Sequence, residues 1–416
     1  MMHGAMLPGP LDLPATREGS GTTWLPDFSP MHALHAMAGR WEFMLHGNVF
    51  IYGIAEGSER GDEDVGSINW FMGMARRRLL GGVLELRAML SAEPVTVGEC
   101  GYPDLLATGE FCDDLGLLHD RQHPHDLFME LAALYERELA DDVAFELYGG
   151  PVGEPALGPT AYPHRPSALP DPFAPITHHW FDATHISFGV VTAGLYGRRW
   201  KLEGSLFNGR EPDDDRFDLD LAPLDSYSGR LWVLPNERWA LQLSAGHLEE
   251  AEIQEFGGAR EDVDRLTASA TYHRPVGRQG IWASTVAVGR NIEEGEGTGA
   301  LLVETSVMPD SKNIVFGRGE VVGKTGDDLA LDVAALEDEV FTVGKLAVGY
   351  VRQFGPFADL VPGLGASVAL SFVGDALEAF YGERLAVGWS IFLSVHPAAM
   401  AMAEPTAPAP HGHPQH

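Results

Sequence analysis

The sequence contains no long hydrophobic run. Hydrophobic residues make up 45% of its 416 residues, yet no stretch approaches the roughly 20 consecutive apolar residues that a membrane-spanning helix requires. A helical membrane protein is therefore excluded. The chain begins Met1-Met2-His3-Gly4, without a basic region followed by an apolar one, so no export signal is visible. Either this start is processed or re-engineered, or the protein is not exported.

Positive charge and cysteine are also scarce. The chain has 28 Lys and Arg against 60 Asp and Glu, a net charge of -32. A nucleic-acid partner is excluded because phosphate-binding surfaces need clustered cations, and metal cations are the expected partners instead. Cys100 and Cys112 are the only cysteines, and the sequence leaves open whether they form a disulfide in an oxidising compartment or remain free thiols.

Enzyme signatures are missing as well. The sequence shows no nucleophile elbow, zinc-protease helix, P-loop or dinucleotide fingerprint in a fitting context. We therefore expect no enzymatic activity. A barrel hydrolase, which would need a nucleophile within hydrogen-bond reach of a loop histidine, is the least favoured hypothesis.

The chain does contain a repeated two-residue alternation. Leu266, Ala268, Ala270 and Tyr272 share one face of a segment whose intervening residues are polar. Such segments follow one another with no helical segments to cover their apolar faces, which favours a closed barrel whose outside meets lipid. A large soluble β-sandwich is the alternative, and it would have to pack those apolar faces against one another.

The predicted fold is all-β: an antiparallel transmembrane β-barrel of about 16 strands with long inward-folding loops on one side. The predicted strands are 41–55, 65–76, 83–93, 126–136, 143–150, 185–196, 200–208, 227–234, 239–247, 264–274, 281–290, 300–308, 313–322, 339–353, 363–373 and 384–395. Short and long connections interleave, so all long loops should lie at one end. Residues 1–40 are predicted to form a periplasmic arm or plug, 41–396 the barrel, and 397–416 a disordered tail.

Two long connections carry the candidate chemistry. The first, 94–125, and the second, 151–184, each end in a run of histidines where a strand begins, and only one hairpin separates them. Imidazole and carboxylate ligands suit Cu(II), Zn or Ni. The predicted ligands there are His123, His125, Asp126, His178, His179, Asp182 and His185. Alternatively, these histidines hydrogen-bond loop carbonyls and carboxylates and merely hold the loops inward.

The first strand supplies a second candidate site. Its odd positions are apolar, so Glu42, Met44, His46, Asn48 and Tyr52 should point into the lumen. Met44 and His46 are predicted metal ligands because thioether and imidazole together favour copper(I) as well as zinc. The competing interpretation is that methionine simply fills gaps. Acidic runs at the long-loop end are predicted to form a solvated rim that holds structural divalent cations.

Four segments carry a resemblance to a known family: residues 21–27, 120–130, 153–159 and 177–185. They resemble a family of mostly uncharacterised bacterial proteins, predicted to be outer-membrane barrels, whose genes often lie near copper or heavy-metal resistance and efflux functions. The segments RQHPHD and THHW are the most specific. The resemblance implies a barrel fold and favours metal binding, and it implies no established activity.

The functional prediction is an outer-membrane β-barrel that binds or conducts metal cations, copper first, at a constriction lined by His, Asp and Met. Its expected partners are outer-membrane lipid, copper or zinc, and a periplasmic efflux or metal-handling protein. The alternative is a structural scaffold barrel that docks a periplasmic partner and transports nothing.

Overall fold

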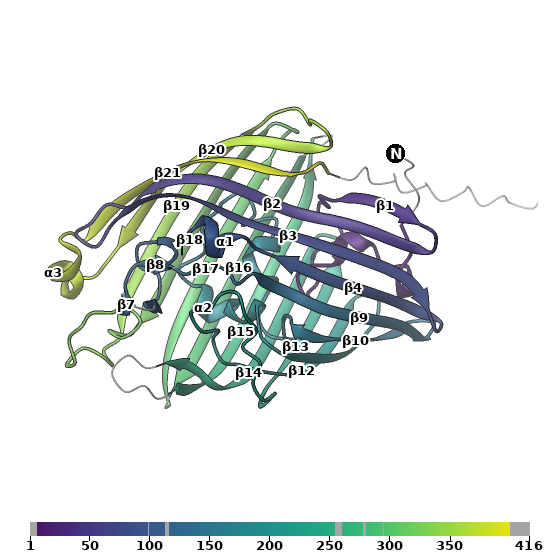
Figure 1. The fold of residues 1–416 in the computed structure, drawn as a ribbon, viewed down its shortest axis with the longest axis horizontal. Helices are drawn as coiled ribbons and strands as arrows, with labels where there is room; N and C mark the ends of the chain where they lie inside the picture. The colour runs from purple at the N-terminus through teal and green to yellow at the C-terminus, as the bar shows by residue number, and fades with distance from the viewer. Residues whose placement is uncertain are drawn as a thin grey trace, which may run out of the picture.

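The computed structural model describes residues 6–98, 100–112, 116–253, 260–277, 280–293 and 295–399. Within these residues, sixteen strands form one closed antiparallel barrel (Figure 1). Its strands are β2 (Trp41–Ala55), β3 (Glu63–Leu79), β4 (Gly82–Leu90), β9 (Phe128–Ala140), β10 (Val143–Val152), β11 (Val190–Tyr196), β12 (Trp200–Phe207), β13 (Ser226–Asn236), β14 (Trp239–Ile253), β15 (Arg260–Val276), β16 (Gly280–Glu293), β17 (Glu296–Met308), β18 (Asn313–Lys324), β19 (Phe341–Gln353), β20 (Leu360–Phe372) and β21 (Leu385–Pro397).

Shorter elements lie in the loops and at the N-terminus. The strands among them are β1 (Leu34–Ala38), β5 (Tyr102–Pro103), β6 (Glu110–Cys112), β7 (Gly116–Leu118) and β8 (Arg121–Gln122). The helices are η1 (Pro10–Asp12), η2 (Ala15–Arg17), α1 (Glu93–Thr96), η4 (Tyr162–His164), α2 (His178–Phe181), η5 (Ala183–His185), η6 (Asp375–Leu377) and α3 (Glu378–Tyr381). No helix in the described ranges is both long enough and apolar enough to cross a membrane. Residues 400–416, which hold nearly all of the predicted tail, lie outside the described ranges.

The barrel closes where its first strand meets its last. β2 pairs with β3 along its whole length, and on its other side it pairs with β21, with Val49 opposite Val395. β1 continues that side of β2 toward the chain start. Each predicted strand overlaps one observed strand, so the predicted fold is confirmed. Two boundaries differ most: β14 extends to Ile253 beyond the predicted 247, and the strand predicted at 185–196 begins only at Val190 because Ala183–His185 form a 3-10 turn.

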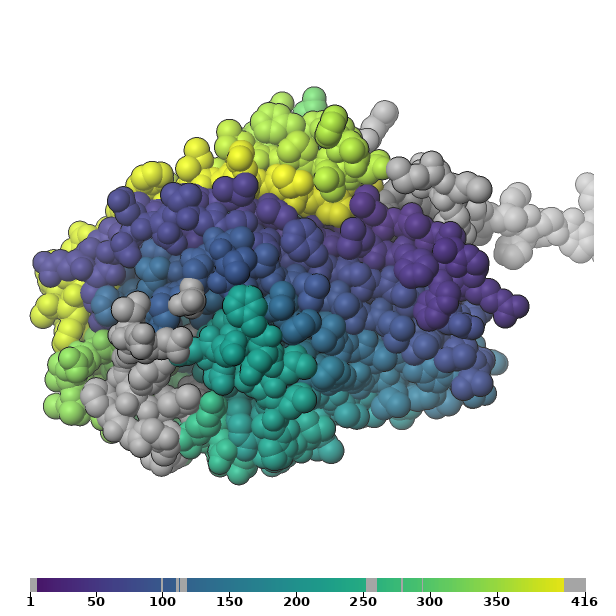
Figure 2. Space-filling view, viewed as in Figure 1, coloured from purple at the N-terminus to yellow at the C-terminus, as the bar shows by residue number. Residues whose placement is uncertain are grey.

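The outer face of the barrel is apolar. On β2, Phe43 and Ile51 are 43% and 52% exposed, while Glu42, Met44 and Asn48 face inward and are buried, as predicted. The wall forms a continuous surface on which the purple N-terminal strands lie beside the yellow C-terminal strand (Figure 2). These exposed apolar faces are not packed against a second sheet, which excludes the β-sandwich. The outside is therefore the lipid-facing surface of a membrane-spanning barrel.

The two ends of the barrel differ as predicted. The connections 80–81, 141–142 and 197–199 are short, whereas 91–127 and 153–189 at the opposite end are long. Both chain ends approach the barrel at the short-turn end, where outer-membrane barrels face the periplasm. One connection at the long-loop end, between β16 and β17, spans just two positions.

Two inserted segments occupy much of the lumen. The first, residues 10–33, we call the plug; its Trp24 packs edge-on against Tyr196, with ring centroids 5.8 Å apart. The second, residues 153–189, we call the inward loop; its Trp180 and Phe181 are buried in an apolar cluster with Leu302 of the wall. The 91–127 connection adds Leu105 and Leu106 to this cluster. Because 16-stranded porins otherwise leave an aqueous channel, these segments together account for the occupied interior.

Ion pairs hold the lumen wall. Arg87 binds Glu85 and lies 3.7 Å from Glu130. Asp126, one of the predicted metal ligands, lies 3.8 Å from Arg216, which the 208–225 connection brings to it.

Glu154, in the inward loop, makes the lumen sensitive to pH. Burial raises its pKa from 4.5 to about 8, although Arg230, 3.6 Å away, opposes the shift. A pKa raised in the folded state contributes stability that is complete below pH 4.5 and is lost as the pH rises through about 8. We expect wild-type stability, relative to Glu154→Gln, to fall by about a few kcal/mol between pH 5 and pH 9. Urea midpoints of both proteins at the two pH values test this, and equal changes would contradict it.

Candidate metal site in the barrel lumen

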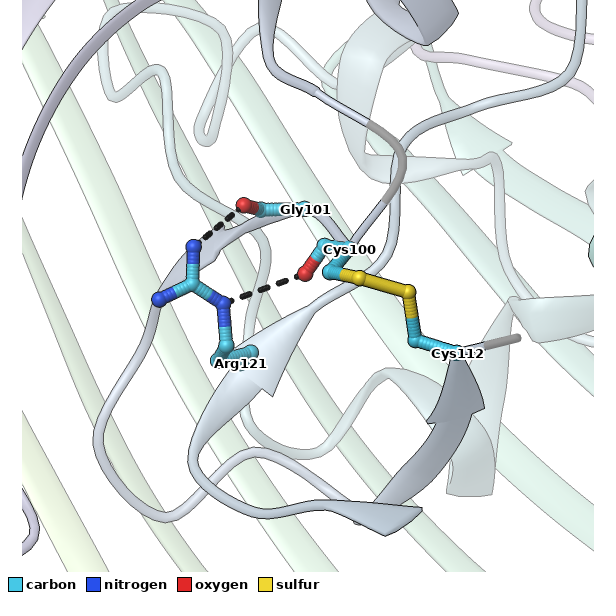
Figure 3. Close-up of a disulfide and its surroundings, with 4 residues drawn as sticks. All are labelled: Cys100, Gly101, Cys112 and Arg121. Atoms are coloured by element: carbon cyan, nitrogen blue, oxygen red, sulfur yellow. Dashed lines mark hydrogen bonds between the residues drawn. A yellow bond between two sulfur atoms is a disulfide. The ribbon is translucent and has the colours of Figure 1, made fainter. Parts of the chain in front are cut away.

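A disulfide holds the connection that carries the first histidine run. Cys100 and Cys112 are bonded to each other, with Cα atoms 5.5 Å apart, which settles the question that the sequence left open. Arg121 donates hydrogen bonds to the carbonyl oxygens of Cys100, at 3.1 Å, and Gly101, at 2.6 Å (Figure 3). The start and the end of this long connection are therefore tied together just before His125.

Three of the predicted histidines meet inside the barrel. The ring of His185 lies 5.3 Å from that of His125 and 5.2 Å from that of His178, measured between centroids. His125 comes from the end of the 91–127 connection, and the other two come from α2 and η5 of the inward loop. The predicted convergence of the two loops thus occurs, and we call these three residues the histidine cluster.

Each ring of the histidine cluster is held through its Nδ1 atom. Nδ1 of His125 lies 2.9 Å from a Glu93 carboxylate oxygen, and Nδ1 of His178 lies 2.9 Å from Asp182 Oδ1. Nδ1 of His185 lies 2.7 Å from the backbone oxygen of Asp182. Metal-binding histidines are oriented in this way, because an Nδ1–H that donates to oxygen leaves the Nε2 lone pair for the metal. Nε2 of His185 is buried and has no hydrogen-bond partner among the described residues.

Burial keeps two of these rings neutral. It lowers the pKa of His178 to about 4 even though Asp182 opposes the shift, and it lowers the pKa of His185 well below the usual 6.5. At His125 the Glu93 carboxylate more than offsets burial and raises the pKa. Tyr162 completes the surroundings, since its hydroxyl lies 3.3 Å from Nε2 of His125. His178 and His185 can therefore offer neutral imidazole nitrogens at physiological pH.

The carboxylate of Asp182 is held by protein donors. It accepts hydrogen bonds from Arg165, at 2.7 Å, from the backbone N–H of Tyr162, at 2.8 Å, and from His178. In this arrangement Asp182 positions two histidines, and its role as a metal ligand stays a prediction. Burial alone would raise the pKa of Asp182, but the fully buried Arg165 and the hydrogen bond from His178 together outweigh it and lower that pKa.

Three other predicted ligands do not reach the cluster's centre. His179 follows His178 on α2, and its Nδ1 lies 3.2 Å from a Glu211 carboxylate oxygen. Nδ1 of His123 lies 3.4 Å from the side-chain nitrogen of Gln122, and Asp126 faces Arg216 as described above. Consecutive residues on one helical turn point in different directions, so a run of histidines cannot place all of its rings in one site.

The first-strand pair occupies another place. Met44 and His46 line a cavity of about 120 Å³ together with Met72, Met74 and residues of the plug. The predicted ligands of the first strand and those of the two loops therefore lie in separate parts of the lumen. Sequence reasoning missed Glu93, Tyr162 and Arg165, which are single polar residues in irregular loops and carry no periodic signal. Met72 and Met74 do carry one, because they alternate along the inward face of β3.

Ligand geometry for hard cations occurs at the long-loop end. Among the described residues, two groups of three possible ligands have their ligand atoms within 4.8 Å of one another. These groups are His247, Glu249 and Asp262, and Asp213, Asp218 and Asp220. The histidine cluster is not among them, so a metal there would draw its rings closer together. Structural divalent cations at the acidic loops stay a prediction.

Comparison with known proteins gives likenesses of fold. No family model matches the chain, and no curated protein matches it. OmpT, an outer membrane protein of Vibrio cholerae, is 8% identical over 87% of this chain and 99% of its own, with a TM-score of 0.49. An anion-selective porin from Comamonas acidovorans is 11% identical over 86% and 99%, with a TM-score of 0.49. The outer membrane channel DcaP of Acinetobacter baumannii is 10% identical over 88% and 100%, with a TM-score of 0.48.

The architecture places the chain in a structural class. A single-chain, even-stranded antiparallel barrel with an apolar outside, short turns at one end and long loops at the other is an outer-membrane β-barrel. The predicted outer-membrane localisation agrees with this architecture. The absence of enzymatic activity stays a prediction.

Proposed function

We propose that this outer-membrane barrel binds borderline transition-metal cations, copper first and zinc second, inside its lumen. The observation that carries the proposal is the histidine cluster, in which the buried His125 and His178 and the half-buried His185 hold oxygen partners through Nδ1, with the other two rings gathered around that of His185. Imidazole nitrogen suits Cu(II) and Zn(II) better than Ca(II) or Mg(II), which take oxygen ligands.

Charge supports the delivery of cations to this site. The loops at the long-loop end carry runs of acidic residues, and the whole chain has a net charge of -32. A field of one sign around a channel mouth raises the local concentration of counter-ions. Cations would therefore gather at the end of the barrel from which both histidine-bearing loops fold inward.

A scaffold role is the second candidate, and the filled lumen favours it. The plug and the inward loop occupy the space through which a solute would pass. In this alternative the histidines brace the loops, and the periplasmic end docks a metal-handling or efflux protein. The two candidates differ in one measurable property, which is whether the histidine cluster takes up metal.

Titration of detergent-extracted protein with Cu(II) and Zn(II) tests the proposal. We expect tight binding of one ion per chain by the wild type, and a loss of affinity of at least ~100-fold in the double variant His178→Gln/His185→Gln, because removal of an orienting partner alone costs about 10- to 100-fold. Glu93→Gln, which alters one such partner, is expected to show that smaller loss.

His273→Gln is the matched control. Its ring is also buried, but it is held by Ser29 at 2.8 Å, away from the cluster. The C-terminal histidines are common to all variants, so only differences between variants report on the cluster. Equal affinities in the double variant and in the control would reject the histidine cluster as a metal site and favour the scaffold role.

A further inference from the structure

The inner face of the β2–β3 hairpin carries an unusual set of donors. In the antiparallel register Met44 lies directly opposite Met74, and His46 lies directly opposite Met72. Directly opposed side chains on one face of a sheet have Cβ atoms about 4.5–5.5 Å apart. Three thioethers and one imidazole therefore form a compact patch that points into the lumen.

Other segments close this patch into a chamber. The cavity of about 120 Å³ over it is lined from the plug by Met31 and His32 and from the inward loop by His164. His396, at the end of β21, lines it too. Four sequence regions thus contribute Met or His side chains to one cavity, which Thr16, Glu18 and Asn48 also line and which we call the methionine chamber. A cavity remains beside these methionines. Filling gaps in the packing therefore does not explain why all of them are there.

Two imidazole nitrogens in the chamber lack partners. Nε2 of His46 and Nδ1 of His32 are buried and have no hydrogen-bond partner among the described residues. The neighbouring His396 differs, since Gln353 lies 2.8 Å from its Nε2 and the Pro397 oxygen lies 2.8 Å from its Nδ1. Buried polar atoms are normally satisfied. The two open nitrogens therefore call for a ligand that accepts a lone pair.

The donor set selects the kind of cation. Thioether sulfur is a soft ligand that favours Cu(I), and imidazole accompanies it well. No thiol competes, because both cysteines are in the disulfide. The chamber's one carboxylate, Glu18, is engaged by Arg76 at 3.2 Å. Among the described residues, the other side-chain oxygens that line the chamber are those of Thr16 and Asn48, too few for a hard cation, which needs several oxygen ligands.

We propose that the methionine chamber is a binding site for a soft monovalent cation, Cu(I) or Ag(I), held by Met44, Met72, Met74 and His46 and closed by the plug residues Met31 and His32. This inference rests on the proposed function, because it adds a second class of cation to the same metal-binding lumen. The chamber shares no residue with the histidine cluster, so the two sites can be tested separately.

The test is a Cu(I) competition titration in detergent with ascorbate present and a coloured Cu(I) chelator as competitor, repeated with Ag(I) as a redox-inert probe. We expect the wild type to withdraw one Cu(I) per chain from the chelator. The triple variant Met44→Leu/Met72→Leu/Met74→Leu, which keeps side-chain size and apolar character, should lose at least tenfold in affinity. X-ray absorption of the wild-type complex should show sulfur together with nitrogen around the metal.

Two further variants serve as a control and as a second test in the Cu(I) titration. Met129→Leu removes a methionine of the same apolar cluster that does not line the chamber, and it should bind Cu(I) as the wild type does. His46→Gln removes one donor without touching the methionine packing, and it serves as the second test should the triple variant fail to show a folded barrel on unheated gels. Cu(I) affinity unchanged in both the triple variant and His46→Gln would overturn the inference.

A Zn(II) titration of the same samples distinguishes a failure of the inference about the methionine chamber from a failure of the proposed function at the histidine cluster. Zn(II) should still bind the triple methionine variant, and Cu(I) should still bind His178→Gln/His185→Gln. Zn(II) binding with no chamber-dependent Cu(I) binding would leave the histidine cluster as the lumen's metal site. The reverse result would reject the histidine cluster and keep the chamber.

Discussion

A chain without residues 1–33 and with 156–184 replaced by a short turn is expected to conduct ions through planar bilayers on the order of tenfold or more better than the full chain. Sixteen-stranded barrels leave an aqueous channel when nothing fills them. The two deletions remove the plug and most of the inward loop. Either deletion alone should raise conductance less, because the other segment remains in the lumen.

The barrel should fold without these segments. Its strands pair with one another in a closed ring, and Gly150 is paired with Val190, so a tight turn can join β10 to β11 once the inward loop is gone. Charged side chains of the barrel wall that contact the plug also have partners on the wall, and these partners remain when the plug is deleted. Glu203, for example, accepts a hydrogen bond from Thr22 of the plug, but it also accepts one from Arg230 at 2.8 Å.

Single-channel recording of the full chain, each single deletion and the double deletion measures the effect. A synthetic peptide of residues 1–33, added to the chain that lacks only the plug, is the control and should lower conductance again. The prediction is wrong if the full chain already conducts as well as the double deletion. In that case the filled interior would still pass ions, and a metal-conducting channel would need no movement of the plug.

Much of this architecture follows from the sequence because lipid imposes a simple rule. One face of each strand must be apolar and every backbone group must be paired, so alternation and turns define the strands. The predicted span 41–55 coincides with β2, and its inward residues Glu42, Met44 and Asn48 are buried as expected. The alternation of short and long connections likewise predicts that the long loops lie at one end of the barrel and the short turns at the other.

The lumen follows no such rule. Side chains there meet through irregular loops, where contacts depend on the path of the backbone and not on period. The sequence indicates that His125, His178 and His185 can converge, but it does not separate them from His123 and His179, because the direction of each ring depends on the local turn. Arg165 shows the same limit, since its partner Glu304 lies 139 residues away.

Arg165→Met is expected to destabilise the folded barrel by about 3–5 kcal/mol, because removing one partner of a buried ion pair leaves uncompensated charge. Arg165 is 0% exposed and contacts two carboxylates, Asp182 at 2.7 Å and Glu304 at 2.6 Å. It is therefore the main tie between the inward loop and β17. Arg318, 3.9 Å from Glu304, would compensate that residue only in part.

Arg210→Met is the control. Arg210 also contacts two carboxylates, of Asp225 at 3.0 Å and Glu250 at 2.7 Å, but its side chain is 17% exposed and its partners are more so. Solvent-exposed ion pairs contribute about 0–1 kcal/mol. Urea unfolding of both variants in lipid vesicles, followed by tryptophan fluorescence, compares the two losses. Similar losses would show that Arg165 does not anchor the inward loop.

Metal binding supplies an independent readout of the same substitution. Asp182 holds His178 through its carboxylate and His185 through its backbone oxygen, and Arg165 fixes the position of Asp182. Loss of an orienting partner of a metal-binding histidine lowers affinity by about 10- to 100-fold. Arg165→Met should therefore weaken Zn(II) binding at the histidine cluster, whereas Cu(I) binding in the methionine chamber should change less, because its donors lie mainly on β2 and β3. Equal losses at the two sites would instead indicate that the whole lumen had rearranged.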